Sequence, residues 1–327
     1  MPSWFQALVL GIVQGLSEFI PISSSAHLVL VPYLLGWTPP DLAFDVALHA
    51  GTLLAVLVYF RAELVAMLLG VLGVRKSADA RLYRRLALLV VLASVPVALA
   101  GYFLDEQVEE VFASPLATSL LLLLTAVLLI AAERVRDRRV ATATPARPAT
   151  AADARQVWRG DWMGGAPQPV VAAPARTLPT GEDPGDPRAR GLEGLGAGRA
   201  LVIGLFQTLA LLPGVSRSGS TISSGMFAGL TREAATRFSF LLSIPALVGA
   251  NIVTLPELGD LGGEVGAAGW TAVAIGVLAA FGSGYFAIRY LIALVARDRL
   301  TGFARYCVAA SVVGVLGYVM IGPPSAV

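Results

Sequence analysis

The chain has 327 residues, of which 56% are hydrophobic and 14% are charged, and its mean hydropathy is +0.73. A soluble protein of this length needs more polar residues to cover its surface, so the composition excludes a soluble fold and predicts a protein embedded in a bilayer. The formal net charge of +2 is too small to indicate a nucleic-acid partner, which leaves membrane lipids as the expected surroundings.

The first half of the chain combines two short apolar segments with three long ones. The short segments, 4–19 and 25–36, are too short or too interrupted by Pro, Gly and Ser to be ordinary membrane-spanning helices. A polar stretch from Pro21 to Ser25, the first break, separates them, and this pattern predicts a re-entrant helical hairpin. Apolar stretches of about 20 residues, long enough to cross a bilayer, follow at 43–60, 84–103 and 115–132.

The second half repeats this arrangement after a long polar stretch. Residues 133–198 mix Ala, Pro, Gly, Arg and Asp without apolar periodicity and predict a flexible cytoplasmic linker. Binding of anionic lipid headgroups by its arginines is the alternative. Two more short apolar segments, 199–212 and 220–230, flank the second break, from Pro213 to Thr221. Further spans are expected at 236–255, 268–290 and 302–321.

Short similarities between the halves predict an internal repeat. Gly11-Ile-Val-Gln14 and the first break match Gly204-Leu-Phe-Gln207 and the second break. Each half crosses the membrane an odd number of times, so the halves must have opposite orientations. The predicted fold is an all-α integral membrane protein, with six transmembrane helices and two re-entrant helical hairpins arranged as an inverted repeat of residues 1–132 and 199–327. Such repeats hold a binding site where the broken segments meet.

The positions of Lys and Arg predict the side that each connection faces, because these residues accumulate in cytoplasmic loops. Basic residues are concentrated from Arg61 to Arg85 and around Arg297, whereas the acidic segments 105–110 and 257–264 contain neither Lys nor Arg. The basic connections and the linker are therefore expected inside, and the acidic segments and both termini outside. The first hairpin then enters the membrane from outside and the second from inside.

The first break carries carboxylate, hydroxyl and imidazole groups together. Gln14 and Glu18 are four residues apart and share one face of a helix, and a carboxylate among apolar residues predicts a functional site. Ser24 and His27 are three residues apart, a spacing at which hydroxyl and imidazole can approach on a helical turn. A serine nucleophile and its base need such an approach. We expect both residues to be catalytic; a structural hydrogen bond of the histidine is the alternative.

Both breaks have features of a phosphate site. Proline ends the incoming helix and serine can cap the outgoing one, whose free N–H groups and dipole favour an anion. In the second break Arg217 lies between serines and glycines, and guanidinium binds phosphate oxygens through two parallel hydrogen bonds. We expect Arg217 to bind the substrate or to pair with Glu18. The expected substrate contacts are Ser23, Ser25, Gln207, Gly214, Ser216, Ser218, Gly219 and Thr221.

The chain has one other histidine, His49, in the apolar stretch that follows the first hairpin. A structural role is favoured for it. Asp45, one helical turn earlier, is either its partner or a group near the outer interface.

The two breaks resemble the signatures of the bacitracin-resistance family of undecaprenyl-diphosphate phosphatases. The segment from Gln14 to His27 is similar to the family's acidic segment and P-x-S-S-S/T-x-H motif, and Pro213 to Gly219 is similar to its P-G-x-S-R-S-G motif. The resemblance covers nearly the whole chain except the linker 133–198, which looks longer than is usual in the family. It implies hydrolysis of undecaprenyl diphosphate on the outer side of the bacterial cytoplasmic membrane, recycling the lipid carrier for cell-wall synthesis and conferring bacitracin resistance.

Position by position, the resemblance implies Ser24 as nucleophile, His27 as the essential histidine, Gln14 and Glu18 as the acidic pair, and Arg217 as the arginine. It also implies a divalent cation, Mg2+ or Ca2+, with Glu18 and Gln14 as ligands, although an amide is a weaker ligand than a second carboxylate. A polyprenyl diphosphate lipid is the expected partner, and a homodimer is a candidate assembly. A transporter or flippase for an anionic lipid is the main alternative, because inverted repeats with broken helices are typical of transporters.

Overall fold

The computed structural model describes residues 1–74, 77–112, 114–142, 189–260, 266–295 and 299–324. These residues form helices and turns, with an isolated bridge between Arg190 and Leu230. The first half contains α1 (Trp4–Phe19), α2 (Ser24–Leu35), α3 (Leu42–Tyr59), α4 (Arg61–Val71), α5 (Ala78–Phe112) and α6 (Pro115–Thr142). The second half contains the short 3-10 helix η1 (Leu192–Gly194), α8 (Ala197–Gln207), η2 (Thr208–Leu211), α9 (Arg217–Phe227), α10 (Arg232–Asp260), α11 (Ala267–Val295) and α12 (Thr301–Ile321).

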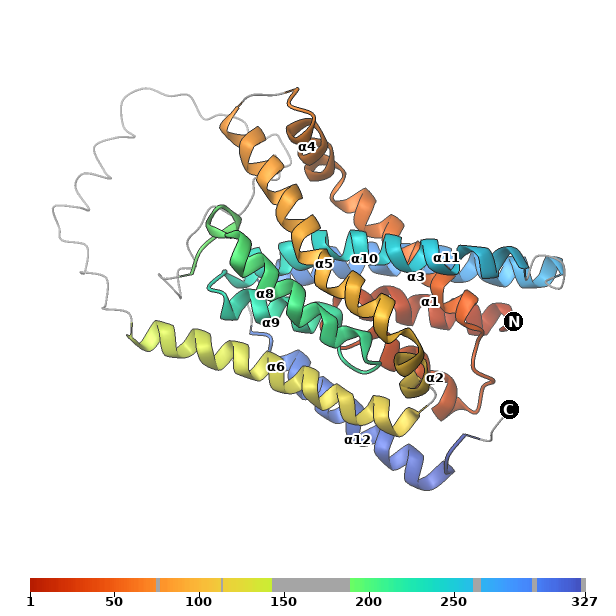
Figure 1. The fold of residues 1–327 in the computed structure, drawn as a ribbon. Helices are drawn as coiled ribbons and strands as arrows, with labels where there is room; N and C mark the ends of the chain where they lie inside the picture. The colour runs from red at the N-terminus through yellow and green to blue at the C-terminus, as the bar shows by residue number, and fades with distance from the viewer. Residues whose placement is uncertain (75–76, 113, 143–188, 261–265, 296–298, 325–327) are drawn as a thin grey trace, which may run out of the picture.

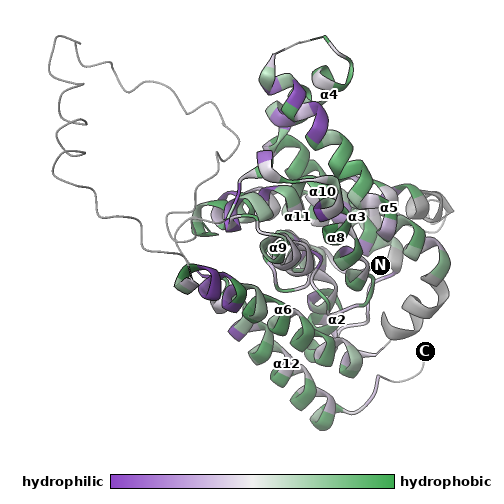
Figure 2. Cartoon of the chain, turned by 60° about the vertical axis from the view of Figure 1, so that its left-hand side comes forward, coloured by the Kyte–Doolittle hydropathy of each residue, from purple (hydrophilic) through white to green (hydrophobic). Residues whose placement is uncertain are grey.

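The long helices make this a multi-pass membrane protein, as the composition predicts. In the described residues, five helices (α5, α6, α10, α11 and α12) are long and apolar enough to cross a bilayer. Helices α3 and α4 are bent by 74° around Phe60 and give a sixth candidate if the bent pair counts as one span. Figure 2 shows hydrophobic residues along α6 and α12, with hydrophilic residues gathered toward one end of α6.

Helix α6 extends past residue 133, where the sequence predicts that the linker begins, and ends at Thr142. Tertiary contacts hold this polar end of the helix. The carboxylate of Glu133 accepts hydrogen bonds from Nε and Nη2 of Arg232 at 2.8 and 2.6 Å, and from the backbone N–H of Leu300 at 2.9 Å. Composition alone cannot reveal such contacts, which is why the predicted boundary differs. Residues 143–188 of the predicted linker lie outside the described residues.

Removing one partner of the Glu133–Arg232 pair should destabilise the protein strongly, because the other charge would stay buried without compensation. The two side chains are only 2% and 10% exposed, and breaking such a pair costs about 3–5 kcal/mol. The Glu133→Gln variant is therefore expected to unfold in detergent at a clearly lower temperature than the wild type. Asp137→Asn is the matched control. Asp137 pairs with Arg299, the two side chains are 41% and 55% exposed, and exposed pairs contribute about 0–1 kcal/mol. Equal losses in the two variants would contradict this assignment.

The short helices α1 and α8 each pack against a long helix of the other half. Helix α1 packs against α11 and α8 packs against α5, while α6 runs along α12 (Figure 1). Glycines permit these close approaches: Gly11 faces the carbonyl oxygen of Gly276, and Gly204 faces that of Ala93, so that a larger side chain would collide with backbone. The two broken segments are thereby held inside the helix assembly, and the start of α1 and the end of α12 lie toward the same end of it (Figure 1).

An aromatic cluster fixes the end of α1. The ring of Phe19, the last residue of α1, packs edge-on against Phe240 of α10 with centroids 5.4 Å apart, and Phe240 packs against Phe60 at the α3–α4 bend with centroids 6.3 Å apart. All three side chains are almost completely buried. Because Glu18 directly precedes Phe19, this cluster also fixes the backbone that carries Glu18.

Candidate active site

The first break is a sharp turn between two helices. Helix α1 ends at Phe19, and Pro21, which has no backbone N–H to donate, follows the extended cap residue Ile20. Helix α2 begins at Ser24, and the hydroxyl of Ser23 caps it by accepting a hydrogen bond from the backbone N–H of Ala26 at 3.3 Å. The serine cap predicted for the outgoing helix is therefore confirmed.

The second break has the same construction. Gly214 adopts a φ of +102°, and the hydroxyl of Ser216 caps α9 by accepting a hydrogen bond from the backbone N–H of Gly219 at 3.0 Å. The N–H of Ser216 in turn donates to the hydroxyl of Thr125 in α6 at 2.8 Å. Glycine is required at 214, because an added side chain would be strained at that φ and would collide with the carbonyl oxygen of Thr118.

The two breaks are in direct contact. The backbone N–H of Gly214 donates to the hydroxyl of Ser25 at 3.3 Å, and the hydroxyl of Ser218 donates to the carbonyl oxygen of Ile20 at 3.2 Å. The amino-terminal ends of α2 and α9 are therefore held together, as the sequence predicts for a site built where the broken segments meet.

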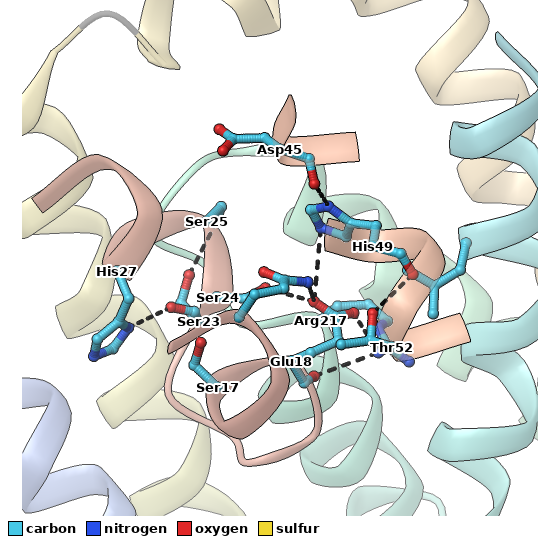
Figure 3. Close-up of polar contacts among 12 residues, drawn as sticks. Ser17, Glu18, Ser23, Ser24, Ser25, His27, Asp45, His49, Thr52 and Arg217 are labelled. Atoms are coloured by element: carbon cyan, nitrogen blue, oxygen red, sulfur yellow. Dashed lines mark hydrogen bonds and ion pairs between the residues drawn. The ribbon is translucent and has the colours of Figure 1, made fainter. Parts of the chain in front are cut away.

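Glu18 is the centre of the polar cluster between the breaks (Figure 3). One carboxylate oxygen accepts a hydrogen bond from Nη2 of Arg217 at 2.8 Å. The other accepts one from the hydroxyl of Ser24 at 2.6 Å and one from the amide of Gln14 at 3.1 Å. The side chains of Glu18 and Arg217 are 6% and 13% exposed, so these charges lie in a low-dielectric site where their interaction is strong. The cluster therefore places a hydroxyl and a guanidinium on the two oxygens of one buried carboxylate, and a hydroxyl beside a proton acceptor is the arrangement that a serine nucleophile requires.

His49, for which the sequence favours a structural role, lies beside this cluster. Its Nδ1 is 2.7 Å from the carbonyl oxygen of Asp45, and since a carbonyl oxygen can only accept, Nδ1 is the donor. Its Nε2 is 3.8 Å from a carboxylate oxygen of Glu18 (Figure 3). The sequence separates these residues into different helices, so only the packing of α1 against α3 brings them together. The sequence signal for His49 is that, like Glu18, it is a titratable residue in an apolar segment.

His27 does not contact Ser24, contrary to the sequence prediction. Its Nδ1 is 2.6 Å from the carbonyl oxygen of Ser23, and its Nε2 is 2.7 Å from the hydroxyl of Tyr306 in α12. Figure 3 shows the imidazole pointing away from Glu18. Side chains in a helix point back toward its amino terminus, so the imidazole of His27 reaches the carbonyl of Ser23 while the hydroxyl of Ser24 turns to Glu18.

Among the remaining predicted substrate-binding residues, the serine and threonine hydroxyls are engaged in contacts within the fold, whereas the amide of Gln207 is not. The hydroxyls of Ser23 and Ser25 lie 3.1 Å apart, those of Ser216 and Ser218 lie 3.0 Å apart, and the hydroxyl of Thr221 is 2.6 Å from that of Ser239. Gln207 is buried at the end of α8, and neither of its side-chain polar atoms has a hydrogen-bond partner. Nothing in the described residues joins Gln207 to Glu18, and its binding role stays a prediction.

The donors available to a divalent cation are limited. Among the described residues, no three His, Cys, Asp or Glu side chains are grouped as metal ligands. Both oxygens of Glu18 are engaged, whereas the buried Oε1 of Gln14 has no hydrogen-bond partner. This donor set fits a cation that takes most of its ligands from water and substrate oxygens, as Mg2+ commonly does.

Comparison with known proteins places this arrangement in a family. The sequence matches the family described as bacitracin resistance protein BacA over residues 7–166 and 170–313. The chain belongs to this family. The match includes most of residues 133–198, so the expectation that the resemblance leaves out the linker is wrong.

Three relatives illustrate the similarity, and each is named undecaprenyl-diphosphatase. The protein of Pelotomaculum thermopropionicum is 39% identical over 287 residues, 88% of each chain. The protein of Desulfosudis oleivorans is 39% identical over 312 residues, 92% of this chain and 94% of the relative. The protein of Gemmatimonas aurantiaca is 37% identical over 314 residues, 96% of this chain and 97% of the relative. The similarity therefore extends over nearly the full length of both partners.

Proposed function

We propose that the protein hydrolyses undecaprenyl diphosphate to undecaprenyl phosphate and inorganic phosphate. The observation that carries this proposal is the contact of Ser24 with Glu18 at 2.6 Å, with Arg217 on the other oxygen of the same carboxylate. Phosphoryl transfer needs a positioned nucleophile, a proton acceptor and a cation on the transferring oxygens. The family match and the names of the relatives support this reaction. It regenerates a lipid carrier for cell-wall synthesis and accounts for bacitracin resistance.

In the proposed first step, the hydroxyl oxygen of Ser24 attacks the terminal phosphorus as its proton passes to Glu18. The bond from that phosphorus to the bridging oxygen breaks, and undecaprenyl phosphate leaves with the bonding electron pair. Glu18 then passes this proton to the departing undecaprenyl phosphate and is a carboxylate again. In the second step, water gives a proton to Glu18 as its oxygen attacks the phosphoserine. The bond from phosphorus to the Ser24 oxygen breaks, and that oxygen takes the proton back from Glu18 as phosphate is released. Arg217 and the amino-terminal ends of α2 and α9 stabilise the charge on the equatorial oxygens.

A divalent cation, Mg2+ or Ca2+, is part of this proposal. Gln14 Oε1 and Glu18 would hold it together with diphosphate oxygens, and the unpartnered, buried Oε1 of Gln14 supports this assignment. When bound, the cation would neutralise part of the charge of the diphosphate. The positioning of the terminal phosphoryl group, which the reaction also needs, comes from Arg217, Ser24 and the amino-terminal ends of α2 and α9.

The proposed topology is an inverted repeat of six membrane spans and two re-entrant hairpins, α1–α2 and α8–α9. The packing supports it, because equivalent helices of the two halves make equivalent contacts. Helices α1 and α3 of the first half pack against α11 of the second half. Their counterparts α8 and α10 pack against α5, the counterpart of α11 in the first half. We place the protein in the bacterial cytoplasmic membrane with both termini and the site facing outside. The end of α6 at Thr142 lies opposite the start of α1 and the end of α12 (Figure 1), as this topology requires. A homodimer stays a prediction.

Release of phosphate from undecaprenyl diphosphate by the purified protein in detergent tests the function. We expect release with Mg2+ or Ca2+ present and a loss of about 100-fold or more after chelation with EDTA, because part of the charge stabilisation is removed. Activity should return when the cation is added back. Absence of release from folded, metal-supplied protein would contradict the proposed hydrolysis, and full activity in excess EDTA would contradict the metal assignment alone.

A further inference from the structure

Ser23 has a backbone conformation that is unusual for its residue type. Its φ is +71° and its ψ is +100°, and no other non-glycine residue in the described part of the chain has a positive φ. An L-residue in such a conformation is strained and persists only where surrounding contacts hold it. Ser23 directly precedes Ser24, so its backbone sets the direction from which the Ser24 hydroxyl approaches Glu18.

The carbonyl group of Ser23 is held by two side chains in series, first His27 and then Tyr306. A carbonyl oxygen can only accept, so the contact of 2.6 Å requires a proton on Nδ1 of His27. In the neutral imidazole, Nε2 is then an acceptor, and the hydroxyl of Tyr306 at 2.7 Å donates to it. The two rings are also stacked, with centroids 5.6 Å apart and planes 10° apart. The carbonyl oxygen of Ser23 therefore sets the tautomer of the imidazole, and Tyr306 holds its orientation.

Tyr306 belongs to α12, which contacts the first break at a second point. The thiol of Cys307 lies 3.7 Å from the carbonyl oxygen of Pro21. The last helix of the chain thus holds two carbonyl groups of the turn between α1 and α2, one directly and one through His27.

We propose that Tyr306 and His27 are positioning residues that hold the strained Ser23 and so aim Ser24 at Glu18. This inference rests on the proposed function, in which Ser24 is the nucleophile. His27 is not the base: both of its nitrogens are engaged away from Ser24, and the hydroxyl of Ser24 donates to Glu18 at 2.6 Å.

Two substitutions of His27 distinguish positioning from proton transfer. Asparagine places an amide N–H near the position of Nδ1, and Asn251 in α10 shows that such an amide reaches the carbonyl four residues earlier, that of Leu247, at 2.8 Å. Glutamine extends its amide toward the position of Nε2 and loses the contact with Ser23. We expect His27→Asn to keep kcat within about tenfold of the wild type and His27→Gln to lower it about 100-fold, with KM little changed. Equal losses in both would overturn the proposal, since neither amide can accept a proton at neutral pH.

Tyr306→Phe tests the hydrogen bond between Tyr306 and His27, because it keeps the stacked ring and removes only the hydroxyl. We expect kcat to fall about tenfold, with KM within about twofold. In the His27→Asn background, which no longer reaches Tyr306, the same change should have no further effect. Tyr33→Phe is the matched control: it also removes a tyrosine hydrogen bond between α2 and the end of α12, to the carbonyl oxygen of Gly322, but not at the site. Equal kcat values for the two Phe variants would overturn the proposal.

The tautomer can be measured without any assay of activity. The chain has two histidines, so 15N spectra of histidine-labelled protein contain two imidazoles, and the His27 signals are those lost in His27→Asn. We expect His27 to carry its proton on Nδ1. A proton on Nε2 alone would overturn the positioning chain. An inactive wild type would instead contradict the proposed function, and a fully active Ser24→Ala variant would contradict the role of Ser24 as nucleophile. In both cases the spectrum would still report on His27.

Discussion

Alanine at position 24 is expected to lower kcat for hydrolysis of undecaprenyl diphosphate by about a thousandfold or more, the loss typical for a covalent nucleophile. The hydroxyl of Ser24 is the only group of that side chain that can react, and Glu18 accepts its hydrogen bond at 2.6 Å in the buried cluster. The intermediate can be trapped by acid quenching of a single turnover, followed by mass spectrometry of the peptide that carries residue 24. A phosphate ester on Ser24 is the expected species.

Ser17→Ala provides the control for this change. Ser17 is buried in the same helix as Glu18, but its hydroxyl donates to the carbonyl oxygen of Val13 within α1. Removal of this hydroxyl should leave kcat within about twofold of the wild type, because its hydrogen bond lies within α1 and does not involve Glu18. Mid-helix back-bonding of this kind also contributes little to stability. Near-normal turnover of the Ser24→Ala variant would contradict the covalent mechanism and favour direct attack by water.

Arg217→Ala is expected to lower kcat/KM by about a thousandfold, through both kcat and KM. The guanidinium that binds the phosphate is lost, and Glu18, 6% exposed, is left as a buried carboxylate without its guanidinium partner. Arg217→Lys should recover only part of the loss, because an ammonium group cannot form two parallel hydrogen bonds. Steady-state kinetics and thermal unfolding of both variants check this, since loss of the ion pair should also lower stability.

The coupling of Arg217 with Glu18 gives a second criterion. Because the two side chains are in direct contact at 2.8 Å, the double variant with Glu18→Ala should lose much less than the sum of the single losses. A mild and equal effect of Arg217→Ala on kcat and KM, or additive losses in the double variant, would show that Arg217 acts elsewhere.

The main features of the fold follow from the sequence, because bilayer thickness and helix breakers control them. The stretches at 84–103, 115–132, 268–290 and 302–321 all lie within long helices, and proline and serine give the observed turn between α1 and α2. The bend at Phe60 and the extension of α6 past residue 133 could not be predicted in this way. They depend on tertiary contacts, such as the pair of Glu133 with Arg232, which are not encoded in local periodicity.

The same distinction applies to the site. A charge in an apolar segment indicates function by itself, and the predicted alternative that Arg217 pairs with Glu18 is confirmed. The partner of Ser24 was predicted wrongly, because spacing shows that His27 can approach Ser24 but not which way the imidazole turns at the start of a helix. The neighbours His49 and Tyr306 come from distant segments, and only the packing of α3 and α12 brings them to the first break.

The ion pair between Glu18 and Arg217 also has a consequence for assembly. The carboxylate comes from the first half of the chain and the guanidinium from the second. A polypeptide with only one half would carry a single uncompensated charge at membrane depth, where such a charge is costly. A shortened relative that retains one of the two motifs would therefore need another polypeptide to supply the opposite charge, and heteromeric complementation would be its route to a working enzyme.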